Sequence, residues 1–213
     1  MRFKVLCTAD EGFAGFIEYI PGKYAWRAVE ADGYMVIHCI MLYRKRDKGK
    51  GYGSLLLKKC LEDAKDGNMR GVAVITSKGT WMAGKDLFEK NGFDLVDQAP
   101  PQFELLVRRF RENAPLPEFK ADWGERLKSY RKGLTIICSD QCPYVAKSVR
   151  EICETAHKRD GVKANLVELR DCKQAQKAPS AYGTFSMIYN GRLITDHPIS
   201  NTRFTNIMDG AVK

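Results

Sequence analysis

Apolar and polar positions follow a short period along the first 43 residues and a longer period after them. Three stretches near the start are rich in β-branched and aromatic residues and are separated by glycine-containing turns, which predicts three strands in an antiparallel meander. These stretches are Phe3–Cys7, Phe13–Ile20 and Tyr34–Tyr43. Leu57, Leu61 and Ala64 then recur at helical spacing opposite charged residues, which predicts an amphipathic helix from near Gly53 to Gly67-Asn68.

Further apolar segments predict the rest of a first domain. Gly71–Ser77 is typical of a strand buried on both faces, and it completes a β-α-β unit. Trp81, Gly84 and Phe88 predict a second helix that ends at Asn91-Gly92. Two closing strands flank the Pro100-Pro101 turn, at Phe93–Val96 and Phe103–Phe110. The first domain is therefore expected to cover residues 1–111.

The second half of the chain predicts a linker and a smaller domain. Residues 112–133 contain helix-breaking residues at the start and mostly polar and charged residues after them, which indicates a linker with at most one short helix. From residue 134 to 213 the pattern predicts a strand (LTIIC), a helix after SDQCPY, a strand (ANLVEL) and a hairpin that turns at Asn190-Gly191. This order is thioredoxin-like. The fold class expected for the whole chain is α/β, or α+β.

Composition restricts the partners of this chain. It has 213 residues, of which 44% are hydrophobic, and a formal net charge of +9 that favours phosphates and other anions. No aromatic-basic RNA motif accompanies the charge, so nucleic acid is not the expected partner. We expect no membrane span and a cytoplasmic location. The seven cysteines form no CxxC pair and the three histidines lie far apart, so no metal site is expected.

A basic, glycine-rich loop lies between a predicted strand and a predicted helix. Such a loop exposes backbone N–H groups to an anion, and the helix N-terminus adds positive potential, so a pyrophosphate would fit. The loop has neither the Walker A ending nor the GxGxxG spacing. The predicted cofactor-binding residues are Leu42, Tyr43, Lys48, Gly49, Lys50, Gly51, Tyr52 and Gly53. The alternative is a glycine-rich turn that only connects strand to helix.

Two segments carry a family resemblance. Lys48-Gly49-Lys50-Gly51-Tyr52-Gly53 resembles the Arg/Gln-x-x-Gly-x-Gly loop of the GNAT superfamily of N-acetyltransferases, and a second register begins at Arg46. Leu87–Phe93 resembles the superfamily's Leu-Tyr-x-Lys-x-Gly-Phe segment. The resemblance implies a GNAT acyl-CoA N-acyltransferase fold over residues 2–110. It further implies that acetyl-CoA is the cosubstrate and that acetyl passes by direct attack to a small-molecule or peptide amine.

The chain departs from the family pattern at several positions. Phe88 stands where the family has a tyrosine that protonates the leaving thiolate, so the usual acid is absent. Glu18 and His38 are the candidates for the catalytic base, on strands that the resemblance places near the acetyl group. For His38, which shares a strand face with Val36 and Ile40, an ordinary core histidine is the alternative. The family's opening strand and helices are not recognisable, so we expect an N-terminally shortened domain.

Cys142 is the thiol candidate in the second domain. Gln141-Cys142-Pro143-Tyr144 resembles the CPYC motif of glutaredoxins, in which a helix N-terminus activates the thiol. Val145 stands in place of the second cysteine, which excludes a dithiol cycle with that residue. The layout of both domains resembles the acetyltransferases with a YoaP-like C-terminal domain. The alternative function is a thiol-dependent binding or redox module centred on Cys142, with the first domain as a CoA-binding scaffold. A homodimer is left open.

Overall fold

The protein was analysed as a computed structural model that describes residues 1–9, 12–79, 81–120 and 122–211. Residue 121 of the predicted linker and residues 212–213 of the predicted second domain lie outside the described residues. The chain divides into two compact units. Unit 1 comprises Met1–Ala25 and Val29–Phe119, and unit 2 comprises Trp26–Ala28 and Lys120–Lys213. Among the described residues, no helix is long and apolar enough to cross a membrane.

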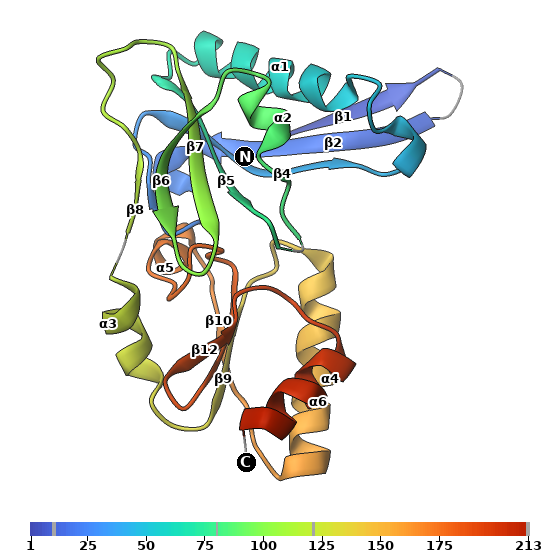
Figure 1. The fold of residues 1–213 in the computed structure, drawn as a ribbon, viewed down its shortest axis with the longest axis vertical. Coiled ribbons are helices and arrows are strands. Elements are labelled where there is room, and N and C mark those ends of the chain that lie inside the picture. The colour runs from blue at the N-terminus through green and yellow to red at the C-terminus, as the bar shows by residue number, and fades with distance from the viewer. Residues whose placement is uncertain (10–11, 80, 121, 212–213) are drawn as a thin grey trace. The chain divides into compact units, whose positions relative to one another are not determined.

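Unit 1 is built on a six-stranded sheet in the order β1-β2-β4-β5-β7-β6 (Figure 1). The strands are β1 (Arg2–Thr8), β2 (Gly12–Pro21), β4 (Tyr34–Leu42), β5 (Gly71–Ser77), β6 (Asp94–Ala99) and β7 (Phe103–Arg109). All neighbours are antiparallel except β4 and β5, which are parallel and are joined through helix α1 (Tyr52–Asp66). The predicted meander, amphipathic helix, β-α-β unit and closing hairpin are therefore confirmed.

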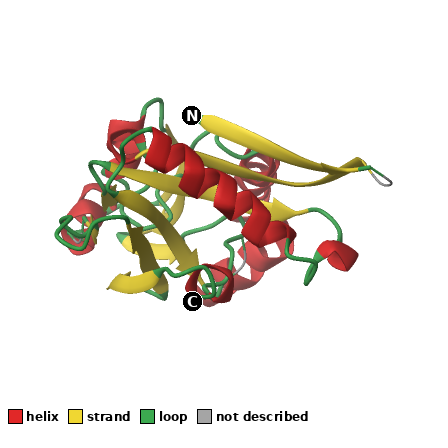
Figure 2. Cartoon of the chain, turned by 90° about the horizontal axis from the view of Figure 1, so that it is seen from above, coloured by secondary structure: helices red, strands yellow, loops and turns green. Residues whose placement is uncertain are grey.

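Helix α1 covers one face of this sheet, as its apolar stripe predicts. Figure 2 shows this helix lying over the sheet. Its buried residues Leu57, Cys60 and Ala64 share one core cluster with Ile17 of β2 and Val74 of β5. Because β5 is buried along its whole length, it carries the continuous apolar run that the sequence shows.

The second helix of unit 1 is shorter than predicted. Helix α2 covers only Asp86–Glu89, whereas a helix reaching back to Trp81 was expected. Trp81 has a φ angle of 75°, a left-handed conformation that a right-handed helix cannot include. The helix therefore begins only after Gly84, and Phe88 is its one buried residue.

The predicted linker is divided between the two units. Its first part contains β8 (Glu118–Phe119), which pairs with β3 (Val29–Glu30) in unit 1. Its second part contains α3 (Trp123–Leu127) and the 3₁₀ turn η3 (Lys128–Tyr130), which belong to unit 2. Two further 3₁₀ turns, η1 (Gly22–Tyr24) and η2 (Lys45–Asp47), lie in unit 1.

Unit 2 contains a four-stranded sheet in the order β10-β9-β11-β12. Its elements are β9 (Leu134–Cys138), α4 (Pro143–Asp160), β10 (Asn165–Glu168), α5 (Cys172–Gln176), β11 (Phe185–Tyr189), β12 (Arg192–Thr195) and α6 (Asn201–Ala211). Asn190 and Gly191 have φ angles of 49° and 79°, so the predicted hairpin turn is confirmed. The predicted order of strand, helix, strand and hairpin is present. Assignment of this unit to the thioredoxin-like fold stays a prediction.

Unit 2 also includes three residues from the first part of the chain. Trp26 packs against the cluster around Ile137 and Ile188. The buried Arg27 donates hydrogen bonds to the Tyr182 carbonyl and the Thr184 hydroxyl. The core of unit 2 is thus completed by residues that lie more than a hundred positions before its first strand.

Candidate functional site

Strands β4 and β5 pair over only part of their length. Their parallel register runs from Tyr34–Gly71 to Ile37–Val74, although β4 continues to Leu42 and β5 to Ser77. Beyond Val74, β5 keeps its pairing with β7, and Figure 1 shows β4 and β5 diverging. The sheet therefore opens at the carboxyl ends of two parallel strands, which is where open α/β sheets commonly bind ligands.

A β-bulge in β4 lies just beyond the last paired residue. Ile17 pairs with Ile40 and Tyr19 with Ile37, so β4 has one more residue than β2 in this interval, and Glu18 lies opposite both His38 and Cys39. The His38 Nδ1 atom is 3.4 Å from the Glu18 Oε1 atom. The His38 side chain is 3% exposed and that of Glu18 is 14% exposed. Both predicted base candidates are thus brought together at the opening of the sheet.

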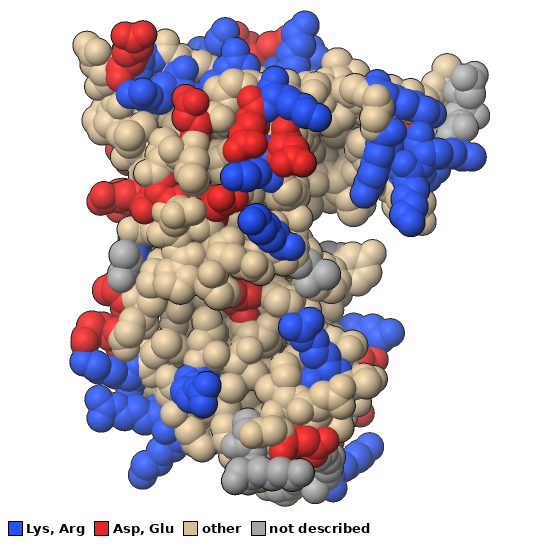
Figure 3. All heavy atoms as spheres, viewed as in Figure 1, with Lys and Arg blue, Asp and Glu red and all other residues tan. Residues whose placement is uncertain are grey.

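The segment after β4 concentrates positive charge. Five of the seven residues from 44 to 50 are Lys or Arg and one is acidic, and Figure 3 shows basic side chains gathered over this segment. The acidic residue, Asp47, is 1% exposed and lies 3.2 Å from the Arg44 Nε atom and 3.5 Å from the Lys50 Nζ atom. The buried Asp47 carboxylate therefore stabilises the loop by pairing with a basic residue on each side of it. Asp47 is not among the loop residues predicted from the sequence, although a single acidic residue within a basic run is a signal that could have identified it.

The predicted cofactor loop leads directly into helix α1. Gly51 is the N-cap with a φ angle of 80°, and Gly49 has a φ angle of 83°, so both glycines adopt the left-handed conformation. A Cβ atom added at either position would meet no described atom within 4 Å. The first helical hydrogen bond runs from the Leu55 N–H to the Gly51 carbonyl, so the preceding N–H groups of the first turn have no acceptor within the helix.

The two motif segments of the sequence meet at this helix start. A Cβ atom at Gly53 would lie 3.2 Å from the Leu87 side chain, so the glycine lets α2 approach the first turn of α1 closely. The Asn91 side-chain amide donates to the Ser54 hydroxyl at 3.0 Å. Leu87 and Asn91 belong to the second motif segment, which therefore supports the loop by packing.

Other predicted residues divide between the loop and the core. Leu42 packs at the edge of the core, Tyr43 is exposed, and Lys48, Lys50 and Tyr52 lie on the loop and the first turn. Phe88 is fully buried against Phe93, so its position offers no proton donor. The Tyr19 hydroxyl, on the neighbouring strand β2, donates to the Asp63 carboxylate at 2.8 Å. Burial and this hydrogen bond raise the pKa of Tyr19, which makes its hydroxyl a structural group.

Unit 2 carries the predicted thiol and a polar cluster that sequence reasoning missed. Cys142 is the N-cap of α4, and its thiol is free. Cys138 is also a free thiol, and burial raises its pKa to about 11.

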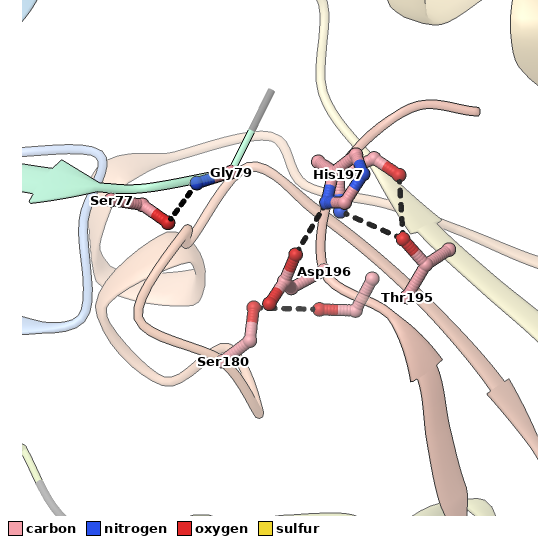
Figure 4. A network of polar contacts seen from close by, with 7 residues as sticks. Ser77, Gly79, Ser180, Thr195, Asp196 and His197 are labelled. Carbon is pink, nitrogen blue, oxygen red and sulfur yellow. Dashed lines mark hydrogen bonds and ion pairs between the residues drawn. The ribbon is translucent and has the colours of Figure 1, made fainter. Parts of the chain in front are cut away.

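After β12, the His197 Nδ1 atom is 2.6 Å from the Asp196 Oδ1 atom, and the Thr195 hydroxyl donates to the His197 carbonyl (Figure 4). These contacts close the turn that follows β12. Among the described residues, no group of three potential ligands could hold a metal ion.

This chain is similar to known proteins over most of its length. Residues 164–206 match a family model described as YoaP-like. Over 199 residues the chain is 33% identical to the uncharacterized N-acetyltransferase YoaP of Bacillus subtilis, a match that covers 91% of this chain and 77% of that protein.

Solved structures similar to about half of the chain include two acetyltransferases. An acetyltransferase from Thermus thermophilus is 20% identical, with 51% of this chain and 64% of that chain covered and a TM-score of 0.40. A candidate streptothricin acetyltransferase from Bacillus anthracis, solved in complex with acetyl-CoA, is 20% identical, with 51% and 62% covered and a TM-score of 0.42.

Proposed function

The chain belongs to the YoaP-like family of N-acetyltransferases, and from this membership we propose that it transfers the acetyl group of acetyl-CoA directly to an amine. The loop from Lys48 to Gly53 binds the pyrophosphate of acetyl-CoA. The observation that carries the proposal is the start of α1, where the left-handed Gly51 opens a turn of N–H groups toward the basic loop.

The residues of the loop fit a pyrophosphate in shape and in charge. The space around Gly49 and Gly51 is open, so an anion can approach the backbone closely. Lys48 and Lys50 add positive charge beside the helix N-terminus, whose macrodipole favours an anion. Bound there, acetyl-CoA supplies an activated acetyl thioester at the opening between β4 and β5.

Glu18 is the proposed proton acceptor, and His38 is the residue that orients it. An amine nucleophile must lose a proton to attack the thioester carbonyl, because its ammonium form has no free electron pair. The C–N bond forms as the C–S bond breaks, the amine proton passes to the Glu18 carboxylate, and solvent protonates the departing CoA thiolate. Solvent protonates the thiolate because the Phe88 side chain has no acidic group that could do so.

Calorimetric titration of acetyl-CoA into the full chain tests the binding loop. The Gly51→Glu variant adds bulk and negative charge to the loop, and we expect it to weaken binding by tenfold or more, or roughly 1.4 kcal/mol. Gly51→Ala imposes the same left-handed strain without the charge, and Gly124→Glu adds the same charge at an open position of unit 2. Equal binding by the wild type and Gly51→Glu would contradict the loop assignment.

The Cys142→Ser variant separates this proposal from a thiol-based function. Cys142 lies in unit 2, and the proposed transfer uses residues of unit 1 alone. We therefore expect Cys142→Ser to keep both its affinity for acetyl-CoA and its rate of amine acetylation. Loss of acetylation in this variant, with acetyl-CoA binding intact, would favour the thiol-based alternative.

A further inference from the structure

One acidic residue lies inside the basic loop that is proposed to bind acetyl-CoA. Asp47 is the last residue of the 3₁₀ turn η2, and its side chain is only 2% exposed. Its two neighbours in the sequence, Arg46 and Lys48, are exposed. A carboxylate in a loop that binds an anion opposes binding by charge repulsion. The position of Asp47 therefore calls for a role other than contact with the ligand.

Asp47 pairs with the basic residues three positions before it and three positions after it. Its Oδ2 atom is 3.2 Å from the Arg44 Nε atom, and its Oδ1 atom is 3.5 Å from the Lys50 Nζ atom. Buried charges in proteins are paired, because an unpaired charge loses its hydration without compensation. One buried carboxylate thus connects the start of the loop to its end.

The Arg44 end of this connection is anchored outside the loop. The Arg44 Nη2 atom donates to the Phe13 carbonyl of β2 at 2.8 Å. Tyr43, the residue before it, donates its backbone N–H to the Ala14 carbonyl of the same strand at 2.9 Å. Through Arg44, the Asp47 carboxylate therefore joins the far end of the loop to β2.

The Lys50 end lies between the two glycines that are proposed to admit the pyrophosphate. Gly49 has a φ angle of 83°, and Gly51, the N-cap of α1, has a φ angle of 80°. Glycine has no Cβ atom to restrict its backbone, so neither residue fixes the direction of the neighbouring N–H groups by itself. An ion pair on Lys50, which stands between them, supplies a restraint that the glycines lack.

We propose that Asp47 is a positioning residue for acetyl-CoA, which acts through Lys50 to hold Gly49 and Gly51 in the conformation that binds the pyrophosphate. This inference rests on the proposed binding of acetyl-CoA at the loop. Asp47 itself does not contact the ligand. A loop that is ordered before the ligand arrives binds more tightly, because less conformational entropy is lost on binding.

The Asp47→Asn variant separates positioning from simple electrostatics, because the two effects have opposite signs. The amide removes one negative charge near a bound anion, and by charge alone it would tighten the binding of acetyl-CoA. Loss of the ion pairs leaves the loop less ordered, which weakens binding. We expect calorimetric titration of the full chain to show acetyl-CoA affinity reduced about fivefold or more.

Asp86→Asn is the matched control for the removal of a charge. Asp86 is exposed and precedes Leu87, whose side chain lies near Gly53 at the start of α1. No pairing within the loop depends on it, so we expect this variant to bind acetyl-CoA at least as tightly as the wild type. Weakening equal to that of Asp47→Asn would overturn the inference.

The Lys50→Gln background tests whether Asp47 acts through Lys50. In this background Asp47→Asn should weaken acetyl-CoA binding by about twofold or less, because the ion pair is already absent. A fivefold effect that persisted would overturn the inference, as would equal or tighter binding by Asp47→Asn alone. Thermal unfolding checks that each variant is folded at the temperature of the titration.

NMR relaxation of the backbone N–H groups reads the order of the loop without any ligand. We expect the order parameters of Gly49 and Gly51 to fall from about 0.85 in the wild type to below about 0.6 in Asp47→Asn, while those of β5 stay unchanged. Lys50→Gln breaks the same pair from its half-exposed end, so it gives this readout even if Asp47→Asn does not fold. Unchanged order parameters in both variants would overturn the inference.

The relaxation measurement also keeps this inference distinguishable from the proposed function. If the wild type bound no acetyl-CoA, the proposed acetyl transfer would fail. A loss of order at Gly49 and Gly51 in Asp47→Asn would still support the positioning of the loop by Asp47.

Discussion

The Asn91 side-chain amide donates to the Ser54 hydroxyl at 3.0 Å, and it thereby ties the end of α2 to the first turn of α1. The same amide also donates to the Leu87 carbonyl at 2.7 Å. The Asn91 carbonyl in turn accepts from the Arg108 guanidinium of β7 at 2.8 Å. The turn that presents the N–H groups of α1 is thus held from a segment about forty positions later in the chain.

Asn91→Ala removes this connection. We expect it to destabilise the protein by about 1–2 kcal/mol, because the Ser54 hydroxyl and the Leu87 carbonyl each lose a partly buried partner. The affinity for acetyl-CoA should fall a few-fold, since the first turn of α1 is no longer held. Urea unfolding and calorimetry measure the two effects. Asn113→Ala, at an exposed turn, is the control, and an Asn91 variant that matched it would contradict the role assigned here.

Gly183 tests how tightly residues 26–28 are built into unit 2. Its φ angle is 80°, and an added Cβ atom would lie 2.8 Å from the Arg27 Cα atom. Gly191 has a nearly identical φ angle of 79°, but its nearest neighbour, the Arg131 Cα atom, is 3.8 Å away. Both Gly→Ala changes carry the backbone strain, about 1 kcal/mol, and only Gly183→Ala adds a clash with backbone atoms.

We therefore expect Gly183→Ala to cost at least about 3 kcal/mol and Gly191→Ala about 1 kcal/mol. Thermal unfolding of the two variants and the wild type measures the difference. Equal costs would indicate that Trp26 and Arg27 do not hold their places in unit 2 and that this unit is completed by its own contiguous chain.

Much of the fold could be predicted because the signals are local. The buried run Gly71–Ser77, the amphipathic stripe of α1 and the Asn190-Gly191 turn each depend on residues close together in the sequence. Family membership was also predictable, because two short motifs stand in the correct order; the YoaP-like match and the YoaP relative confirm it. The shortened α2 was not foreseen, since a helical period is visible in the sequence but the left-handed φ angle of Trp81 is not.

Long-range relationships of the candidate site could not be predicted. Glu18 and His38 were each proposed, but their contact depends on one extra residue in β4, which no pattern of residue types reveals. The opening between β4 and β5 depends on where a parallel ladder ends. The inclusion of Trp26 in the core of unit 2 is a contact across more than a hundred residues, and such contacts leave no periodic trace.

Asp63 of α1 makes unit 1 sensitive to acid. Burial by itself would raise its pKa, but hydrogen bonds from Tyr19, Arg2 and Lys4 outweigh burial and hold the pKa at about 2, against the usual 3.8. A carboxylate with a lowered pKa stabilises the folded state fully above its unfolded pKa and loses this effect as the pH falls toward its folded pKa. The contribution should therefore disappear between about pH 4 and pH 2.

Asp63→Asn should destabilise the protein by about 2 kcal/mol near neutral pH, which is the size of the pKa shift expressed as energy. The difference from wild type should shrink toward zero as the pH approaches 2. Urea unfolding across this range is the measurement. Glu62→Gln removes an exposed partner of Lys59 on the same helix and should have little effect at any pH. A difference that stayed constant with pH would mean that the charge of Asp63 does not contribute.

Glu18→Gln tests the proposed proton acceptor. The amide keeps the size of the side chain but cannot take a proton at neutral pH, so we expect kcat for amine acetylation to fall by about 10²–10⁴-fold. Acetyl-CoA affinity should stay unchanged, because the binding loop lies elsewhere in the sequence. Glu104→Gln is the matched control, since Glu104 is a carboxylate on β7 of similar exposure that pairs with Lys85. The comparison requires that the two variants are equally stable, and thermal unfolding measures this. If Glu18→Gln kept the wild-type kcat, or if Glu104→Gln lost as much, the carboxylate at the bulge would not be the group that takes the amine proton.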